Sequence, residues 1–128
     1  IKFGAKSDEY ADEIAEKFGI KHLYARHPQS LSEGQKRRVS IAAVVATNPE
    51  VLILDEPTVG QDYKGLCEMV EVLNRIHEET HNTMITVTHD KRCAAALCDR
   101  SVWIKDGKTY KTGDKPQWCL QFEYCAKP

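Results

Sequence analysis

The sequence predicts an α/β fold in which a mostly parallel sheet is flanked by helices. Residues 51–54 are four consecutive apolar β-formers without alternation, which is typical of an inner strand covered on both faces. A long helical stripe and a second strand pattern at residues 83–88 follow this run. With 128 residues the chain is one domain at most, and it is long enough for a real core.

Three helical segments are expected before the first strand. Residues 7–18 have the spacing of an amphipathic helix, and residues 20–26 that of a shorter helical piece. A third helix begins at Ser32 and continues to about residue 46. Pro49 ends it, because proline disfavours the helical conformation of the residue before it.

The start of the third helix combines a cap with positive charge. Ser32 can cap the helix with its hydroxyl, and Gln35 stands where a capping box has Glu or Gln. Gly34 leaves the first turn without a side chain, so a ligand could approach free amides that favour an anion. Residues 36–38 are basic. Taken alone, this pattern also fits a capped helix with a solvated basic face.

Two adjacent carboxylates follow the apolar strand. Asp55 and Glu56 emerge at its carboxyl end, the edge at which open α/β sheets bind ligands. Because successive strand side chains point in opposite directions, one acid could hold Mg²⁺ while the other polarises water. A solvated acidic turn leading into Pro57 would give the same sequence, and these residues alone leave both interpretations open.

A long helix and a second strand lead to a histidine. Asp62 can cap a helix that runs to about residue 79, and its apolar stripe indicates core packing. The strand at residues 83–88 ends at His89, whose imidazole could donate to a phosphate oxygen, although a histidine in this place is often only structural. The stripe consists of Leu66, Met69, Val70, Leu73 and Ile76.

A hairpin is expected near the end of the chain. Residues 91–98 form an Ala-rich helix pattern, and residues 101–105 read as a strand. Asp106-Gly107 is a hairpin turn signal, and residues 109–111 would be the return strand. Residues 113–128 contain no motif that indicates a function.

Four segments of the chain together resemble the C-terminal half of an ABC-type transporter ATPase, a P-loop NTPase-like domain. Residues 31–35 resemble the signature motif LSGGQ, with Glu33 departing at the third place. Residues 51–56 resemble the Walker B strand, and residues 58–62 resemble the D-loop, although only the last residue matches its usual SALD closely. His89 stands where the family has its switch histidine, and the resemblance extends from residue 1 to about residue 107.

The resemblance implies ATP and Mg²⁺ as cofactors and a role for each residue. Asp55 would hold Mg²⁺, Glu56 would be the catalytic carboxylate, and His89 would sense the γ-phosphate. In the family, ATP lies between the phosphate loop of one subunit and the signature of the other. The residues expected on the nucleotide-binding side are Ser32, Glu33, Gly34, Gln35 and Asp62.

The resemblance also implies a domain plan and partners. Residues 1–50 would be the helical subdomain with the signature helix, residues 51–112 the Walker B strand through the C-terminal strands, and residues 113–128 an unassigned tail. The partners would be a second ABC ATPase subunit, identical or different, and a transmembrane transporter subunit at the cytoplasmic face of the membrane. Residues 1–4 and the following helix most resemble ATPases of the energy-coupling-factor group, which serve cobalt, nickel or vitamin uptake.

The phosphate loop is the part of this plan that the 128 residues lack. No G-x-x-x-x-G-K-[ST] motif occurs in them, and neither does the glutamine loop. Because the chain begins with Ile1, we expect it to be a piece of a longer protein that hydrolyses ATP. The piece alone is expected to bind ATP weakly and not to turn it over. A non-transport ABC ATPase of translation or DNA repair, and a catalytically silent half-cassette that docks on a partner, remain open.

Composition sets further bounds on the function. The formal net charge is −1, so charge alone implies no nucleic-acid partner. No apolar run approaches the roughly 20 residues of a membrane span. The five cysteines are odd in number and form no Cys-x-x-Cys pair, so we interpret them as reduced thiols rather than a metal site. Cys119 and Cys125, which lie close to Trp118 and Tyr124 in the sequence, are the only pair to check as an exception.

Overall fold

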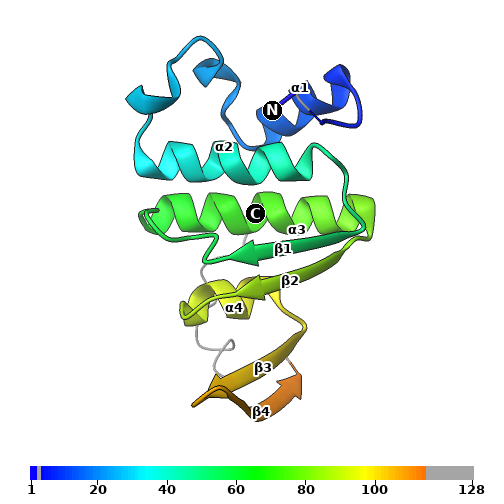
Figure 1. Ribbon diagram of the computed structural model, residues 1–128, viewed down its shortest axis with the longest axis vertical. Helices are drawn as coiled ribbons and strands as arrows, with labels where there is room; N and C mark the ends of the chain where they lie inside the picture. The colour runs from blue at the N-terminus through cyan, green and yellow to red at the C-terminus, as the bar shows by residue number, and fades with distance from the viewer. Residues whose placement is uncertain (3, 115–128) are drawn as a thin grey trace.

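The computed structural model describes the chain except residue 3 and residues 115–128. The elements follow in the order α1 (Asp8–Lys17), the 3₁₀ helices η1 (Lys21–Leu23) and η2 (Pro28–Ser30), α2 (Glu33–Val45), β1 (Val51–Asp55), α3 (Tyr63–Thr80), β2 (Thr83–Val87), α4 (Lys91–Leu97), β3 (Arg100–Lys105) and β4 (Lys108–Asp114) (Figure 1). The helical piece predicted at residues 20–26 is only the single 3₁₀ turn of η1, followed by turns.

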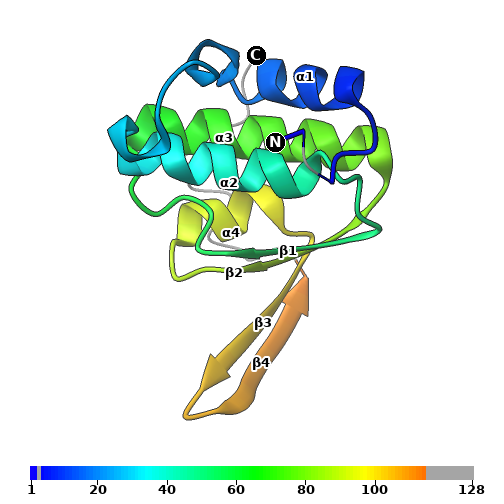
Figure 2. The ribbon, with the colours of Figure 1, turned by 45° about the horizontal axis from the view of Figure 1, so that its top comes forward.

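β1 and β2 form the parallel pair that the sequence predicts. Their register places Asp55 opposite Val87, so both strands end at the same edge. The helix α3 connects them, and all the helices lie on one side of the pair (Figure 2). The residues that follow the two strands, beginning with Glu56 and Thr88, are therefore brought together at one edge of the sheet.

The core lies between this pair of strands and the helices. From β1, Leu52 and Leu54 point into it, and from α3 the whole predicted apolar stripe is buried. Leu73 is fully buried, and α3 begins at its predicted cap, where the Asp62 carboxylate accepts a hydrogen bond from the Gly65 amide at 2.7 Å. The other members of the core come from the first two helices and their connections: Ala11, Ile14, Ala15, Phe18, Ile20, Leu23, Ile41, Ala42, Val45 and Ala46.

The outer face of the parallel pair contradicts one prediction. The sequence pattern of residues 51–54 predicts cover on both faces, but Val51 and Ile53 are 52% and 66% exposed. Ile85 and Val87 of β2 are exposed beside them. The reason is that the helices cover only the inner face, and no other segment that the structure describes lies over the outer one (Figure 2).

β3 and β4 form a separate antiparallel hairpin that extends away from the helices (Figure 1). The predicted turn is confirmed: Asp106 and Gly107 have φ angles of 51° and 71°, as the tight two-residue turns of hairpins require. The return strand is longer than the predicted residues 109–111 and reaches Asp114. The rest of the tail, with Cys119 and Cys125, lies outside the described residues.

Two observations bear on the composition. Among the described residues, Cys93 is buried and Cys67 and Cys98 are partly buried, and none of the three forms a disulfide with another of them. Within the part of the chain that the structure describes, no helix has the length and apolar character needed to cross a membrane.

The packing of α3 generates a stability prediction. Replacing Leu73 by Ala removes buried apolar contacts and leaves a cavity, so the free energy of unfolding should fall by about 2–5 kcal/mol. Urea denaturation followed by circular dichroism measures this change. Glu78→Ala on the exposed side of the same helix is the control and should change the free energy of unfolding by less than about 0.5 kcal/mol. Equal effects of the two substitutions would contradict the assignment of the core.

Candidate functional site

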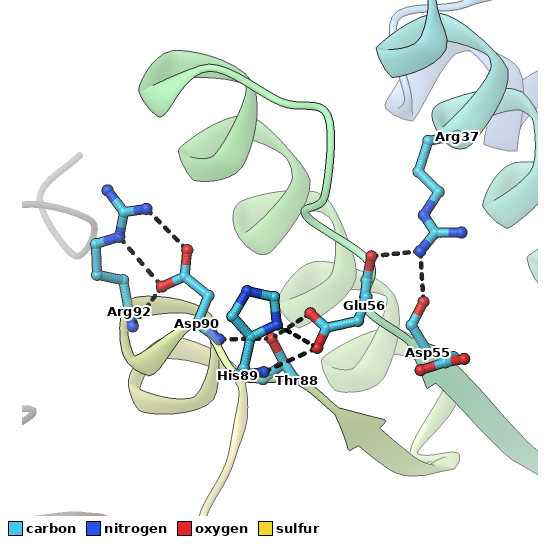
Figure 3. Close-up of polar contacts among 7 residues, drawn as sticks. All are labelled: Arg37, Asp55, Glu56, Thr88, His89, Asp90 and Arg92. Carbon is cyan, nitrogen blue, oxygen red and sulfur yellow. Dashed lines mark hydrogen bonds and ion pairs between the residues drawn. The ribbon is translucent and has the colours of Figure 1, made fainter.

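The ends of β1 and β2 hold the carboxylate of Glu56 (Figure 3). Its Oε2 accepts a hydrogen bond from the Thr88 hydroxyl at 3.0 Å, and its Oε1 accepts one from the His89 amide at 2.9 Å. The Nδ1 atom of the His89 ring lies 2.6 Å from the same Oε1. Two residues that follow β2 thus fix the direction of a side chain that follows β1.

The Thr88 hydroxyl also connects this carboxylate to α4. It accepts a hydrogen bond from the Asp90 amide at 3.0 Å while it donates to Glu56. Asp90 caps α4 through the Arg92 amide at 2.8 Å, and its carboxylate also pairs with the Arg92 guanidinium. Hydrogen bonds of Thr88 and Asp90 therefore hold the segment after β2 in place on both sides of His89.

These contacts shift the pKa values of both partners. The hydrogen bond from His89 is the largest cause that lowers the pKa of Glu56 below its ordinary value. The same contact raises the pKa of His89 above its ordinary 6.5. The Glu56 side chain is 27% exposed and the His89 side chain 82% exposed. Glu56 is consequently an ionised acceptor beside an accessible imidazole, which suits orienting a water molecule better than storing a proton.

Asp55 points in a different direction from Glu56 (Figure 3). It lies on the outer face of β1, as the alternation of side chains along a strand predicts. Among the residues that the structure describes, no group of three or more His, Cys, Asp or Glu side chains could hold a metal ion. A single accessible carboxylate fits Mg²⁺, which proteins bind through one or two carboxylates together with substrate phosphates and water.

The start of α2 has the capping box that the sequence predicts. The Ser32 hydroxyl accepts a hydrogen bond from the Gln35 amide at 3.2 Å. The Gln35 side chain in return accepts one from the Ser32 amide at 3.1 Å. The first turn of α2 is thereby fixed, with its remaining amides and the positive end of the helix dipole directed at the space beyond Ser32.

Gly34 is the point at which this turn meets the loop before α3. The Gln61 side-chain amide donates to the Gly34 carbonyl oxygen at 3.0 Å. A Cβ atom on residue 34 would lie 3.2 Å from the Gln61 Nε2 and from the Gly60 carbonyl oxygen. The missing side chain therefore permits close packing of the first turn of α2 against the loop before α3, a role that the sequence did not indicate.

A pocket of about 490 Å³ lies at this junction. It is lined by all the residues predicted for the nucleotide-binding side and by Gly60 and Gln61 of the neighbouring loop. The predicted residues are Ser32, Glu33, Gly34, Gln35 and Asp62. Asp62 is at the same time the cap of α3, so its carboxylate is already engaged by a backbone amide.

The predicted residues therefore fall into two groups. One is the pocket at the start of α2, and the other is the sheet edge with Asp55, Glu56 and His89. Sequence reasoning missed the contacts of three residues that act between elements, Thr88, Arg37 and Gln61. Thr88 could have been found, because it precedes His89 at the end of a strand. Arg37 was counted only as a basic residue, yet its guanidinium reaches the carbonyl oxygens of the residues at the end of β1 (Figure 3).

The contact between Glu56 and His89 generates a pH prediction. Glu56→Gln removes the negative charge, so the pKa of His89 should fall toward 6.5, as measured by NMR titration of the imidazole. The stabilisation by this pair should be lost as pH falls through the lowered pKa of Glu56. It should also be lost as pH rises through the raised pKa of His89, so it is fully present between about pH 4.5 and 6.5.

The control for this titration is Glu78→Gln, which removes an exposed carboxylate of α3. It should leave the pKa of His89 where it is in the unaltered chain. A His89 pKa that does not move in Glu56→Gln would contradict the contact.

Comparison with known proteins identifies the family. Residues 3–59 match the family model described as ABC transporter. The chain is 43% identical, over 94% of its length, to the energy-coupling factor transporter ATP-binding protein EcfA2 of Enterococcus faecalis. It is 40% identical, over 88% of its length, to the protein of the same name from Geobacillus kaustophilus. These matches cover 45% and 40% of the two relatives, so the chain spans less than half of their length.

Solved structures agree with the sequence matches. The cbiO1 protein of Clostridium perfringens, described as part of the ABC transporter complex cbiONQ, superimposes with a TM-score of 0.74 at 36% identity. That match covers 90% of this chain and 45% of the other. A dimeric bacterial ABC transporter cassette gives a TM-score of 0.76 at 31% identity, over 84% of this chain and 47% of its own. The α/β fold is thus that of part of such a cassette, and the chain belongs to the ABC transporter family of ATP-binding proteins.

Proposed function

We propose that the protein to which these residues belong hydrolyses ATP as the nucleotide-binding subunit of a membrane transporter. The observation that carries this proposal is the Glu56 carboxylate, held at the sheet edge by Thr88 and His89 and left partly open to solvent. Ligands of α/β sheets bind at this edge. An ionised acceptor fixed beside an accessible imidazole is suited to water attack on a phosphate.

Each group at the edge has a part in this chemistry. Glu56 accepts a hydrogen bond from the attacking water and orients it toward the γ-phosphate, since its lowered pKa favours orientation over proton storage. His89, with a raised pKa and an exposed ring, donates to a γ-phosphate oxygen. Asp55 would hold Mg²⁺, which neutralises charge that develops on the phosphate oxygens.

The pocket at the start of α2 would serve a different nucleotide. Its lining includes Ser32 and Gly34 at the start of α2, and the first amides of a helix favour an anion. The 128 residues contain no phosphate loop, so this pocket has no complete nucleotide site beside it in the chain. We assign it to ATP bound on a second ATPase subunit, identical or different, and the dimeric cassette among the structural relatives supports this arrangement.

The transport class is inferred from the relatives. Two of them are named as energy-coupling factor transporter proteins, and a third is described as part of the cbiONQ complex. These names favour uptake of a metal ion or a vitamin over a role in translation or DNA repair. The subunit would then sit peripherally at the cytoplasmic face of the membrane, against a transmembrane partner.

The test of this function is hydrolysis by the longer protein that contains these residues. Glu56→Gln should lower kcat about 10²- to 10⁴-fold while the Kd for ATP changes less than about threefold, because the substitution removes the acceptor and keeps the shape. Phosphate release and equilibrium binding measure the two quantities. Glu78→Gln is the matched control, and hydrolysis that survives Glu56→Gln at the original rate would overturn the proposal.

A second prediction concerns the 128 residues alone. Without the G-x-x-x-x-G-K-[ST] loop there is no cradle of amides and no lysine for the β- and γ-phosphates. The purified chain should therefore bind ATP weakly and release no phosphate above background in a coupled assay with Mg²⁺. Magnesium-dependent hydrolysis that Glu56→Gln abolishes would contradict this expectation and show that the chain holds a complete site.

A further inference from the structure

The backbone of Glu56 has an unusual conformation. Its φ angle is 47°, in the left-handed region that residues other than glycine rarely adopt. Such a conformation persists only where surrounding contacts hold it in place. On the amide side, Glu56 donates to the Val87 carbonyl oxygen at 2.8 Å, which continues the parallel ladder by one bond. The carbonyl side is held by a residue from a different element.

That residue is Arg37 of α2. Its Nη2 atom lies 2.5 Å from the Asp55 carbonyl oxygen and also donates to the Glu56 carbonyl oxygen (Figure 3). Successive carbonyl groups of an extended strand point to opposite sides, so one nitrogen reaches both only when the chain turns between them. The double contact of Arg37 therefore depends on the left-handed conformation of Glu56. If β1 continued straight, Arg37 could not reach both carbonyl oxygens.

The chemistry of the contact favours a strong constraint. A guanidinium is charged, and hydrogen bonds from charged donors are shorter and stronger than those between neutral groups. The Glu56 carbonyl oxygen also accepts a bond from the Val59 amide, at 3.2 Å, so Arg37 adds the connection to α2 that the local turn does not supply. The Arg37 side chain is partly buried, and its Nε makes no hydrogen bond within the described residues.

We propose that Arg37 is a positioning residue for hydrolysis, which holds the turn at Glu56 so that the carboxylate points at the attacking water. This inference rests on the proposed function of Glu56. Arg37 lies two residues after Gln35, within the same helix that lines the pocket for the second nucleotide. The contact thus joins the helix that lines this pocket to the end of β1.

The test uses the longer protein that contains these residues. Arg37→Met keeps the apolar stem of the side chain but removes every donor, and kcat should fall about 10- to 100-fold while the KM for ATP changes less than about threefold. Arg37→Lys keeps the charge without the planar fork, so it should lower kcat about 3- to 10-fold. Arg75→Met is the control, because Arg75 pairs with Glu71 on the exposed side of α3, and its kcat should stay within about twofold.

Hydrogen exchange gives a readout that does not depend on turnover. The His89 amide donates to the Glu56 carboxylate, so a misdirected carboxylate should leave this amide to exchange at least threefold faster in Arg37→Met. Amides of α1 should exchange at their original rate, because that helix contributes to neither contact. Faster exchange in both places would mean general destabilisation and would overturn a positioning role.

The outcomes separate this inference from the proposed function. If Glu56→Gln abolishes hydrolysis but Arg37→Met retains the original kcat, the positioning role is wrong and the function stands. If Glu56→Gln has no effect on hydrolysis, the proposed function itself fails. Should Arg37→Met not fold, Arg37→Lys decides, and an unaltered kcat together with unaltered exchange at His89 overturns the proposal.

Discussion

The hydrogen bond from the Glu56 amide to the Val87 carbonyl oxygen, 2.8 Å long, is the last bond of the parallel ladder. The bond follows from the register that places Asp55 opposite Val87. The same register brings the residues after the two strands, beginning with Glu56 and Thr88, together at one edge of the sheet. A shift by one residue would turn every side chain of β1 to the other face, moving Leu52 and Leu54 out of the core. The burial of these two leucines thus fixes the position of the carboxylate beside Thr88 and His89.

The helix α2 joins the two halves of the candidate site. Its first turn carries the capping box and part of the pocket, its second turn supplies Arg37 to the end of β1, and its last turns belong to the core. The adjacent Arg38 pairs with Glu68 of α3 at 2.7 Å. One helix is therefore in contact with the pocket, with the sheet edge and with α3.

Features set by nearest neighbours along the chain could be predicted from the sequence. The cap at Ser32, the buried stripe that contains Leu73 and the turn at Asp106 all follow from spacings of a few residues, and each is found in the structure. The contacts of Arg37 and Gln61 could not be predicted, because they depend on how α2 crosses β1 and the loop before α3.

The prediction for β1 failed for a related reason. An apolar run shows that a strand is suited to burial on both faces, but it does not say which segment supplies the second cover. Val51, Ile53, Ile85 and Val87 consequently form a contiguous apolar surface next to the charged edge. In solution such a surface on two short parallel strands promotes association between copies and precipitation. The strand whose end carries Asp55 thus also gives the isolated chain a face that favours aggregation.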